Sequence, residues 1–442
     1  MVSVFSHYCS PRQIGLFALE AFALAAAISI ALLLSGAPVL VATVGAPLSV
    51  LLGLFYLVDL YDLSRAATEA RSGPRLLVAL GASAGACGAM ALLLRLSFPP
   101  GALLASFGGA CGAALLVRTA WAAAQPGRLV RLLVFGAGAR ARELARSITS
   151  GAGSEYEIAG FIGENDAQVL SGDKDLLSLA RRVGASIVVV APDDRRGSPV
   201  EQLLRCRASG VQVLEMSTFS ERALRRLPLA VLRPSELAFQ DGFAQSVLAD
   251  SLLRIGDVAM SLIILILSAP ALALVSILIK LDSPGPLLYR QDRVGQGGRT
   301  FEIIKLRTMC CDAEAGTGPV WAGERDARMT RLGALLRKCR VDEIPQVWCV
   351  LRGDMSFVGP RPERPFFVDQ LARQIPFYRL REAVKPGITG WAQIRYPYGA
   401  SIEDARAKLE FDLYYMKHRS LFLNLLVIFH TGKTVLFGKG AR

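Results

Sequence analysis

The sequence predicts an α/β membrane protein with three parts: four transmembrane helices, a Rossmann-like doubly wound domain, and a monotopic α/β domain with a reentrant helix, which is the expected catalytic part. Three observations predict this fold class. Hydrophobic residues make up 52% of the 442 residues and the mean hydropathy is +0.39, which is high for a soluble globular protein. Strand-like and helical stretches alternate around a glycine-rich turn at 136–141. A separate apolar run at 258–279 contains a proline near its centre.

Composition narrows the classes of function. Lysine and arginine number 50 against 37 aspartates and glutamates, so the net charge is +13. A nucleic-acid binder would explain this charge, but the long apolar runs favour a basic surface that faces anionic lipid, and we expect no nucleic-acid partner. Only 3 histidines are present, which disfavours a three-histidine metal site or a Ser-His-Asp triad. The 8 cysteines form no CxxC pair and are expected to be reduced and structural.

The first expected domain, 1–125, contains four apolar stretches, each close to the ~20 residues that a helix needs to cross a bilayer. They are 14–34, 39–61, 75–94 and 101–123. Arginines cluster from the end of the second stretch to the start of the third, and from the end of the fourth stretch onward: Arg65, Arg71, Arg75, Arg118, Arg128 and Arg131. The positive-inside rule places these segments in the cytoplasm, so the rest of the chain is expected to begin there.

The second expected domain, 126–245, begins with a strand-like run at 129–135. The turn that follows has the pattern G-x-G-x-x-A, built from Gly136, Gly138 and Ala141, and leads into a helical stretch. This is the context of a dinucleotide-binding turn. Further strand-like runs are 158–162, 186–190 and 211–214. Together they predict a doubly wound parallel sheet over about 128–220.

Whether this domain binds a dinucleotide is open from the sequence. The acidic ribose ligand should lie ~20 residues after the turn, at the end of the second strand. Glu164 and Asp166 come somewhat late and follow a glycine. We favour a scaffold that uses the glycines for tight packing, with nucleotide binding as the alternative.

The third expected domain, 246–442, begins with the apolar run at 258–279. A spanning helix there would place the charged segment 280–442 outside the cytoplasm, although that segment looks like an enzyme. A helix that turns back within the bilayer removes the conflict. Pro270 removes a backbone hydrogen bond near the centre of the run, and the hydroxyl of Ser268 can satisfy a freed carbonyl. A merely kinked transmembrane helix is the alternative.

Basic residues in the third domain suggest contacts to phosphate groups. Lys305 and Arg307 alternate along a β-like run, so both can face one side. Arg361 lies between Pro360 and Pro362 in a stiffened loop. Arginine is suited to bidentate phosphate contacts and lysine to a point contact. A solvated basic face is the alternative for any one of them.

Asp342 and Glu343 form an adjacent carboxylate pair. Pro345 is tolerated in a helix only within the first turn, so the pair is expected at a helix N-terminus with Asp342 near the N-cap. Backbone N–H groups there would keep Asp342 ionised and help to receive a phosphate. From these residues alone, a capping aspartate beside a solvated glutamate is the favoured interpretation.

Five segments in this order resemble the monotopic phosphoglycosyl transferase family, and the resemblance covers about 250–442. They are DSPGPLLYRQDRVG (282–295), FEIIKLRTM (301–309), VDEIPQ (341–346), GDMSFVGPRP (353–362) and KPGITGWAQ (385–393). The preceding helices and sheet resemble those of the large family members, the bacterial polyprenyl glycosylphosphotransferases that start exopolysaccharide or O-antigen assembly.

The resemblance implies an enzyme of the bacterial inner membrane, multi-pass and with a cytoplasmic catalytic domain. It would transfer a sugar-1-phosphate from a UDP-sugar to polyprenyl (undecaprenyl) phosphate and release UMP. It implies that Asp342 attacks the β-phosphorus and forms a covalent intermediate, that Glu343 helps to hold Mg²⁺, and that Arg361 and Pro362 lie near the uridine and the phosphates. Magnesium prefers one or two carboxylates together with phosphate oxygens, which suits the pair.

The tail 420–437 is short, apolar and flanked by basic residues, which is typical of an interfacial helix. Family members often carry Asp where this chain has Asn424, which leaves the role of that position open.

The expected partners are the UDP-sugar, polyprenyl phosphate and inner-membrane lipid. The sequence does not name the sugar, and it leaves the oligomeric state open, a homodimer included.

Two rival functions are considered. An NAD-dependent nucleotide-sugar dehydratase or epimerase would need a Tyr-x-x-x-Lys pair, but Tyr156 is followed four residues later by Gly160. A scaffold for polysaccharide assembly would need no chemistry, and the Asp342-Glu343 pair argues against scaffolding alone. Because every expected catalytic motif lies after residue 245, we expect 1–245 to be dispensable for chemistry.

Overall fold

The computed structural model forms two compact units, one made mainly of Tyr8–Phe219 and the other of Ser220–Arg442. The structure describes residues 2–4, 7–9, 11–36, 41–57, 79, 81–83, 85, 100–124, 129–149, 155–163, 175–194, 199–239, 242–243, 247–310, 328–396, 399 and 401–437. Short strands β1 (Val2–Val4) and β2 (His7–Cys9) open the chain.

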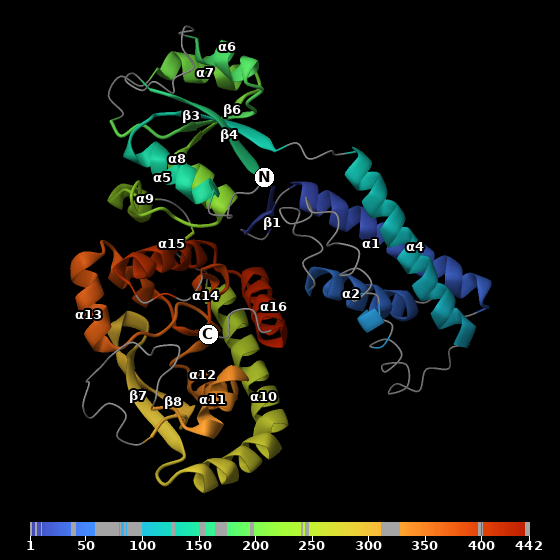
Figure 1. Ribbon diagram of the computed structural model, residues 1–442, viewed down its shortest axis with the longest axis vertical. Helices are drawn as coiled ribbons and strands as arrows, with labels where there is room; N and C mark the ends of the chain where they lie inside the picture. The colour runs from blue at the N-terminus through green and yellow to red at the C-terminus, as the bar shows by residue number, and fades with distance from the viewer. Residues whose placement is uncertain are drawn as a thin grey trace. The chain divides into compact units, whose positions relative to one another are not determined.

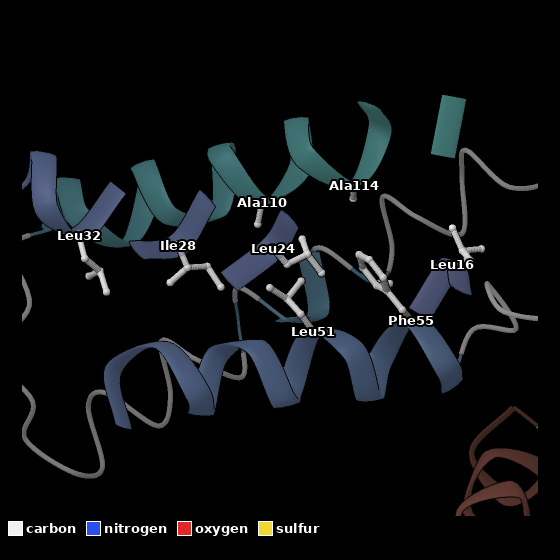
Figure 2. Packing of buried hydrophobic residues seen from close by; sticks show 9 residues of the cluster. Leu16, Leu24, Ile28, Leu32, Leu51, Phe55, Ala110 and Ala114 are labelled. Atoms are coloured by element: carbon white, nitrogen blue, oxygen red, sulfur yellow. The ribbon is translucent and has the colours of Figure 1, made fainter. Parts of the chain in front are cut away.

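Three apolar helices, α1 (Pro11–Leu34), α2 (Val41–Leu57) and α4 (Pro100–Ala124), pack against one another in the first unit. Figure 2 shows side chains from all three meeting between the helices. The buried residues include Leu16, Leu24, Ile28, Leu32, Leu51, Phe55, Ala110 and Ala114. Small alanines on α4 let the helices approach closely, which is typical of helix packing in membranes. The buried carboxylate of Glu20 on α1 pairs with Arg118 on α4, with 2.6 Å between Oε1 and Nε.

Among the described residues, two helical segments are long and apolar enough to cross a membrane: Ile14–Leu34 in α1 and Val247–Asp282. The apolar part of α2, Val44–Phe55, is shorter. The third predicted stretch, 75–94, lies mostly outside the described residues, as do Arg65, Arg71 and Arg75. The prediction of four spans therefore stays a prediction.

A parallel sheet of four strands forms the rest of the first unit, as predicted. Its order is β4-β3-β5-β6, and its strands are β3 (Val130–Phe135), β4 (Tyr156–Ile162), β5 (Ile187–Val190) and β6 (Gln212–Glu215). The helices are α5 (Ala139–Ser147), α6 (Leu176–Arg182), α7 (Val200–Ala208) and α8 (Met216–Phe219). Figure 1 shows α6 and α7 over one face of the sheet and α5 and α8 over the other. Apolar side chains of β3 and β5, such as Leu133 and Val188, fill the core on the α6 and α7 side.

The second unit opens with η3 (Ser220–Leu224) and α9 (Pro234–Phe239), and the segment between them contacts the C-terminal part of the unit. The backbone N–H of Leu227 donates to the carbonyl of Glu410, and the indole of Trp391 donates to the carbonyl of Arg225. The unit therefore begins at Ser220, although 245 was the predicted end of the middle domain.

Helix α10 (Val247–Asp282) is the longest in the described chain and covers the predicted reentrant run. Near its N-terminus, Arg254 donates to the carbonyls of Val350 and Leu351 at 2.6 and 2.7 Å. At its other end, Ile279 packs with Leu306 and Leu336. Both ends of α10 therefore contact the same compact unit, and Figure 1 shows that the helix bends between them. The apolar side chains between the two contacts are exposed, Ile266 by 71% and Leu267 by 76%.

Pro270 lies inside α10 and has no N–H to donate, which is a known cause of helix bending. The predicted help from Ser268 is not what the structure shows, because its buried hydroxyl oxygen bonds to no other described group. Ser276 instead donates to the carbonyl of Leu272 one turn earlier, at 2.6 Å.

The rest of the second unit is a small α/β body around an antiparallel hairpin and a pair of parallel strands. Its strands are β7 (Leu288–Val294), β8 (Thr300–Leu306), β9 (Ser356–Val358) and β10 (Gly387–Thr389). Its α-helices are α11 (Arg331–Lys338), α12 (Val347–Arg352), α13 (Pro365–Gln374), α14 (Trp391–Arg395), α15 (Ile402–His418) and α16 (Leu421–Phe437). Its 3₁₀ helices are η4 (Gln296–Gly298), η5 (Val341–Gln346) and η6 (Tyr378–Ala383). The fully buried Trp391 stacks on Tyr414 at the centre of this body.

Helix α16 covers the predicted apolar tail. Leu423 and Val427 are buried, whereas Leu421 and Leu425 are about half exposed. Asn424, where the family often has Asp, accepts a hydrogen bond from the hydroxyl of Tyr415 at 2.9 Å. The helix therefore docks on the second unit through one face and leaves an apolar face uncovered.

Candidate active site

The carboxylate pair lies in η5, a 3₁₀ helix that begins after an unusual backbone position. Arg340 has φ 58° and ψ 17°, a left-handed conformation, and makes no side-chain capping bond. Asp342 and Glu343 therefore lie in the first turn of η5, as expected, and Asp342 is two residues after the N-cap Arg340. Its side chain is buried, and it accepts no hydrogen bond from the described residues.

Glu343 is surrounded by cations. Lys305 on β8 places Nζ 2.9 Å from Oε1, and a guanidinium nitrogen of Arg340 lies 3.4 Å from Oε2. The Arg361 guanidinium approaches to 4.0 Å of Oε1. Burial alone would raise the pKa of Glu343, but the charges of Lys305, Arg361 and Arg340 outweigh it and lower the pKa to about 2. Glu343 is therefore ionised throughout the physiological range.

The surroundings of Asp342 shift its pKa in the opposite direction, upward. Burial and the neighbouring charge of Glu343 raise the pKa of Asp342, and Lys305, Arg337 and Arg340 only partly oppose this. No backbone N–H group of η5 donates to this carboxylate, so the structure does not show the expected stabilisation of the ionised form by helix N–H groups. An ionised Asp342 is instead poorly stabilised, which makes it a more reactive oxygen nucleophile.

Arg307 is the predicted phosphate ligand that lies away from the pair. Strand β8 ends at Leu306, and the guanidinium of Arg307 donates to the carbonyls of Ser283 and Pro284 at 2.6 and 2.8 Å. It thus holds the chain where α10 ends. Of the two basic residues expected to share one face, only Lys305 reaches the carboxylates, and a substrate contact by Arg307 stays a prediction.

The Pro-Arg-Pro segment carries Arg361 to the edge of the site. The Arg361 side chain is 40% exposed, so its guanidinium is open to solvent while close to Glu343. Pro362 lies beside it and lines a small cavity with Gly295 and Arg381. The structure thus brings together Asp342, Glu343, Lys305 and Arg361, and Pro362 adjoins them.

Two cations near the pair were not predicted. Arg340 contacts Glu343, and Arg337 on α11 contributes to the electrostatic environment of Asp342. Their only signal in the sequence is their position within five residues before the pair in RKCRVDE. That signal was visible, but a short basic stretch is also typical of a solvated helix end.

Asp342 and Glu343 are the two carboxylates that a magnesium ion at this site would contact. Glu343 is ionised, its charge raises the pKa of Asp342, and a divalent cation close to both carboxylates would relieve that repulsion. Within the described residues, no group of three His, Cys, Asp or Glu side chains is arranged to hold a metal. Phosphate oxygens of a substrate would therefore have to complete the coordination.

The glycine-rich turn after β3 already holds an anion of its own chain. Asp193, three residues after the end of β5, accepts from the backbone N–H groups of Ala139 and Arg140 at 2.8 and 2.9 Å. These N–H groups open α5 and lie where a dinucleotide phosphate would bind. A Cβ at Gly138 would lie 2.0 Å from the carboxylate, so the glycine makes room for Asp193. Glu164 and Asp166 lie outside the described residues.

The fold and the site define a membrane-associated α/β protein in which a buried carboxylate pair is ringed by cations suited to phosphate groups. Residues 248–438 match the sequence model of the family described as bacterial sugar transferase. The chain belongs to this family, as its motifs predicted.

Three named bacterial proteins are similar in sequence to this chain. The chain is 41% identical to UDP-N-acetylgalactosamine-undecaprenyl-phosphate N-acetylgalactosaminephosphotransferase of Aeromonas hydrophila, over 60% of this chain and 61% of that protein. It is 42% identical to UDP-glucose:undecaprenyl-phosphate glucose-1-phosphate transferase of Caulobacter vibrioides, over 41% and 69%. It is 39% identical to an exopolysaccharide production protein of Rhizobium leguminosarum, over 42% and 96%. The chain thus spans less than two thirds of the Aeromonas relative.

Proposed function

We propose that this protein is a phosphotransferase that moves a sugar-1-phosphate from a UDP-sugar to undecaprenyl phosphate and releases UMP, in the first membrane step of exopolysaccharide or O-antigen synthesis. One observation carries the proposal. A buried aspartate with a raised pKa lies beside an ionised glutamate, and Lys305, Arg340 and Arg361 converge on this pair. Relatives that share 41–42% identity are named for this type of transfer.

We propose the following reaction, which the placement of these groups supports. An oxygen of Asp342 attacks the β-phosphorus of the UDP-sugar, and the bond from that phosphorus to the oxygen bridging the two phosphates breaks. UMP leaves with the electron pair of that bond. The cations near Asp342 bind the diphosphate and stabilise the charge that gathers on its oxygens. Burial excludes water, which would otherwise hydrolyse the aspartyl-phosphate sugar.

The second step regenerates the enzyme. A phosphate oxygen of undecaprenyl phosphate attacks the same phosphorus, and the bond to Asp342 breaks to return a free carboxylate. Asp342 and Glu343 would hold Mg²⁺, which supplies charge neutralisation for the diphosphate. Arg361 and Lys305 orient the phosphates, and Glu343 keeps both of these side chains in place.

The acceptor requires the site to lie at a membrane surface, because its phosphate stays at headgroup level while its tail stays in lipid. A straight helix of 36 residues would be about 54 Å long and would separate its ends across a bilayer. The two ends of α10 instead contact one compact unit. We infer a reentrant helix, with the catalytic unit on the cytoplasmic face of the bacterial inner membrane.

The first unit is proposed to be a membrane anchor of four spans followed by a Rossmann-like domain. The helices α1, α2 and α4, together with the predicted stretch 75–94, would supply the spans. We propose that the sheet domain binds no dinucleotide, because Asp193 takes the backbone N–H groups that a phosphate would use. This argues against the rival NAD-dependent enzyme and leaves a scaffolding role alongside the chemistry.

The test is to incubate the purified full-length protein with a panel of UDP-sugars, Mg²⁺ and undecaprenyl phosphate, and to follow UMP. Asp342→Asn should lower UMP release by about 10³-fold or more. Its Tm should not fall. The raised pKa of Asp342 means that the ionised carboxylate destabilises the folded state, and asparagine removes that charge. The matched control is Asp369→Asn, an exposed aspartate paired with Arg379. Full activity of Asp342→Asn, or a UDP-sugar product without UMP, would overturn the proposal.

A further inference from the structure

The backbone of the Pro-Arg-Pro segment is held through its carbonyl groups. Pro360 and Pro362 have no N–H, so their backbone can accept hydrogen bonds but not donate them. The carbonyls of Pro360 and Glu363 accept from the backbone N–H groups of Gly387 and Val294, at 2.9 and 3.0 Å. The two carbonyls between them, those of Arg361 and Pro362, receive their bonds from side chains.

Both of these side-chain donors are arginines. A guanidinium nitrogen of Arg381 donates to the carbonyl of Arg361 at 2.9 Å, and one of Arg293 donates to that of Pro362 at 3.0 Å. The side chain of Arg381 is only 11% exposed. A buried arginine that donates to a loop carbonyl fixes the position and orientation of that peptide group, because the N–H donors of the planar guanidinium point in fixed directions.

Arg381 is itself held from two sides. The carboxylate of Asp412 on α15 lies 3.0 Å from the guanidinium, and the hydroxyl of the buried Tyr378 accepts from it at 2.7 Å. A run of contacts therefore joins Asp412, Arg381 and the backbone of Arg361. The exposed guanidinium of Arg361 then lies 4.0 Å from Glu343.

We propose that Arg381, held by Asp412, is a positioning residue that fixes the backbone of Arg361 so that its guanidinium faces the Asp342-Glu343 pair and the diphosphate of the donor. This inference rests on the proposed transferase function. Arg381 acts only through Arg361, because its own guanidinium is used by the loop carbonyl, Asp412 and Tyr378.

The test is a double-mutant cycle with Arg381→Met and Arg361→Ala in the full chain. In the wild-type background, Arg381→Met should lower kcat/KM for the UDP-sugar by about 10- to 100-fold, as expected for a misplaced binding group. In the Arg361→Ala background it should cost less than about twofold, because the group that it positions is gone. Arg379→Met is the matched control, since Arg379 lies on the same η6 helix but pairs at the surface with Asp369. It should leave kcat/KM unchanged.

Asp412→Asn gives a second route if Arg381→Met does not fold, since it keeps the shape and removes the charge. Its effect should likewise vanish in the Arg361→Ala background. The Kd of UDP, measured by calorimetry on the same variants, supplies a readout that needs no turnover. Equal losses in both backgrounds would mean that Arg381 only stabilises the fold, and would overturn the inference. Coupling in the Kd without UMP release from the wild type would overturn the transferase function and leave the positioning role standing.

Discussion

Asp342 and Glu343 are adjacent in the chain, but their surroundings give them opposite charge preferences. Three cations stabilise the ionised Glu343, whereas burial and Glu343 itself disfavour the ionised Asp342. Such a divergence between neighbouring groups is typical of paired catalytic roles. Here it suits a nucleophile in Asp342 and a fixed anchor for cations in Glu343.

We expect Lys305→Met to move the acidic limb of the pH profile to higher pH. Asp342 must be ionised to attack, so activity falls as the pH drops through its pKa. Lys305 lowers the pKa of Asp342, and its removal raises that pKa further. A pH series of kcat/KM for UMP release measures the limb, and the loss of a phosphate contact should also lower the maximum by about 10²-fold. Lys338→Met, at an exposed position on α11, is the control and should leave the limb in place. A limb that stays fixed or moves to lower pH would contradict the assignment.

For single residues, the sequence predicted a role where the signal lay within a short motif. The sequence indicated Lys305 and Arg361 as phosphate contacts, and the structure places both side chains beside Glu343. Arg307 shares the spacing of Lys305, but carbonyls at the end of α10 engage its guanidinium. That contact joins segments distant in the chain, so alternation along a strand could not indicate it. The position of Asp342 depended on the left-handed backbone of Arg340, which no local pattern signalled.

Among the elements, α10 and the turn before α5 carry the two proposals on membrane topology and on dinucleotide binding. Helix α10 has contacts to the catalytic unit at both ends and exposed apolar side chains between them. The turn before α5 has the sequence of a phosphate-binding turn but is satisfied by Asp193. A pattern of glycines shows that an anion can approach, but it does not show which anion does.

For α10 we expect one-sided topology. Ala238→Cys and Arg299→Cys, made singly in a chain without native cysteines, place thiols at exposed positions on either side of the helix. Both should resist a membrane-impermeant thiol reagent in whole cells and react once the inner membrane is opened. The combined change Ser268→Leu and Pro270→Leu restores a backbone donor, so part of the population should span the bilayer and lose activity. Reaction of the Arg299→Cys variant in intact cells would rule out the reentrant helix.

For the glycine-rich turn we expect a structural role. Asp193→Ala removes a helix-capping carboxylate and should cost about 1 kcal/mol, which corresponds to a Tm lower by roughly 2 to 4 °C. Glu201→Ala, on the exposed surface of α7, is the control and should change the Tm far less. NAD should not raise the Tm of the wild type in thermal unfolding experiments. Stabilisation of the wild type by NAD would show that a dinucleotide can displace the Asp193 carboxylate from the backbone N–H groups of the turn.

On the scale of the whole molecule, the chain separates into two compact units, and the second, proposed to be catalytic, is made mainly of Ser220–Arg442. The family and the parallel sheet were predicted from sequence and are confirmed. Residues 220–239 have no motif, but they join the second unit through contacts with segments distant in the chain. Glu221, for example, contacts His418 and Lys417 at 2.7 and 2.8 Å.

We therefore expect a fragment of 220–442 to fold and release UMP, whereas 246–442 should be less stable. The shorter fragment loses the contacts of Glu221, of the Arg225 carbonyl with Trp391, and of Leu227 with Glu410. At about 1 kcal/mol each, these total about 3 kcal/mol, or a Tm lower by roughly 6 to 12 °C. Thermal unfolding in nanodiscs compares the two. Equal stability would show that 220–245 is an appendage, and an inactive but folded 220–442 would show that the first unit takes part in chemistry.

The most direct test of the account is to mix the wild-type protein with its UDP-sugar and Mg²⁺ in the absence of undecaprenyl phosphate. The covalent mechanism predicts a burst of about one equivalent of UMP per active site. It also predicts a mass increase of one sugar phosphate on the peptide that contains Asp342, and neither signal in Asp342→Asn. UMP that forms only after undecaprenyl phosphate is added, with no adduct on the protein, would contradict transfer through Asp342.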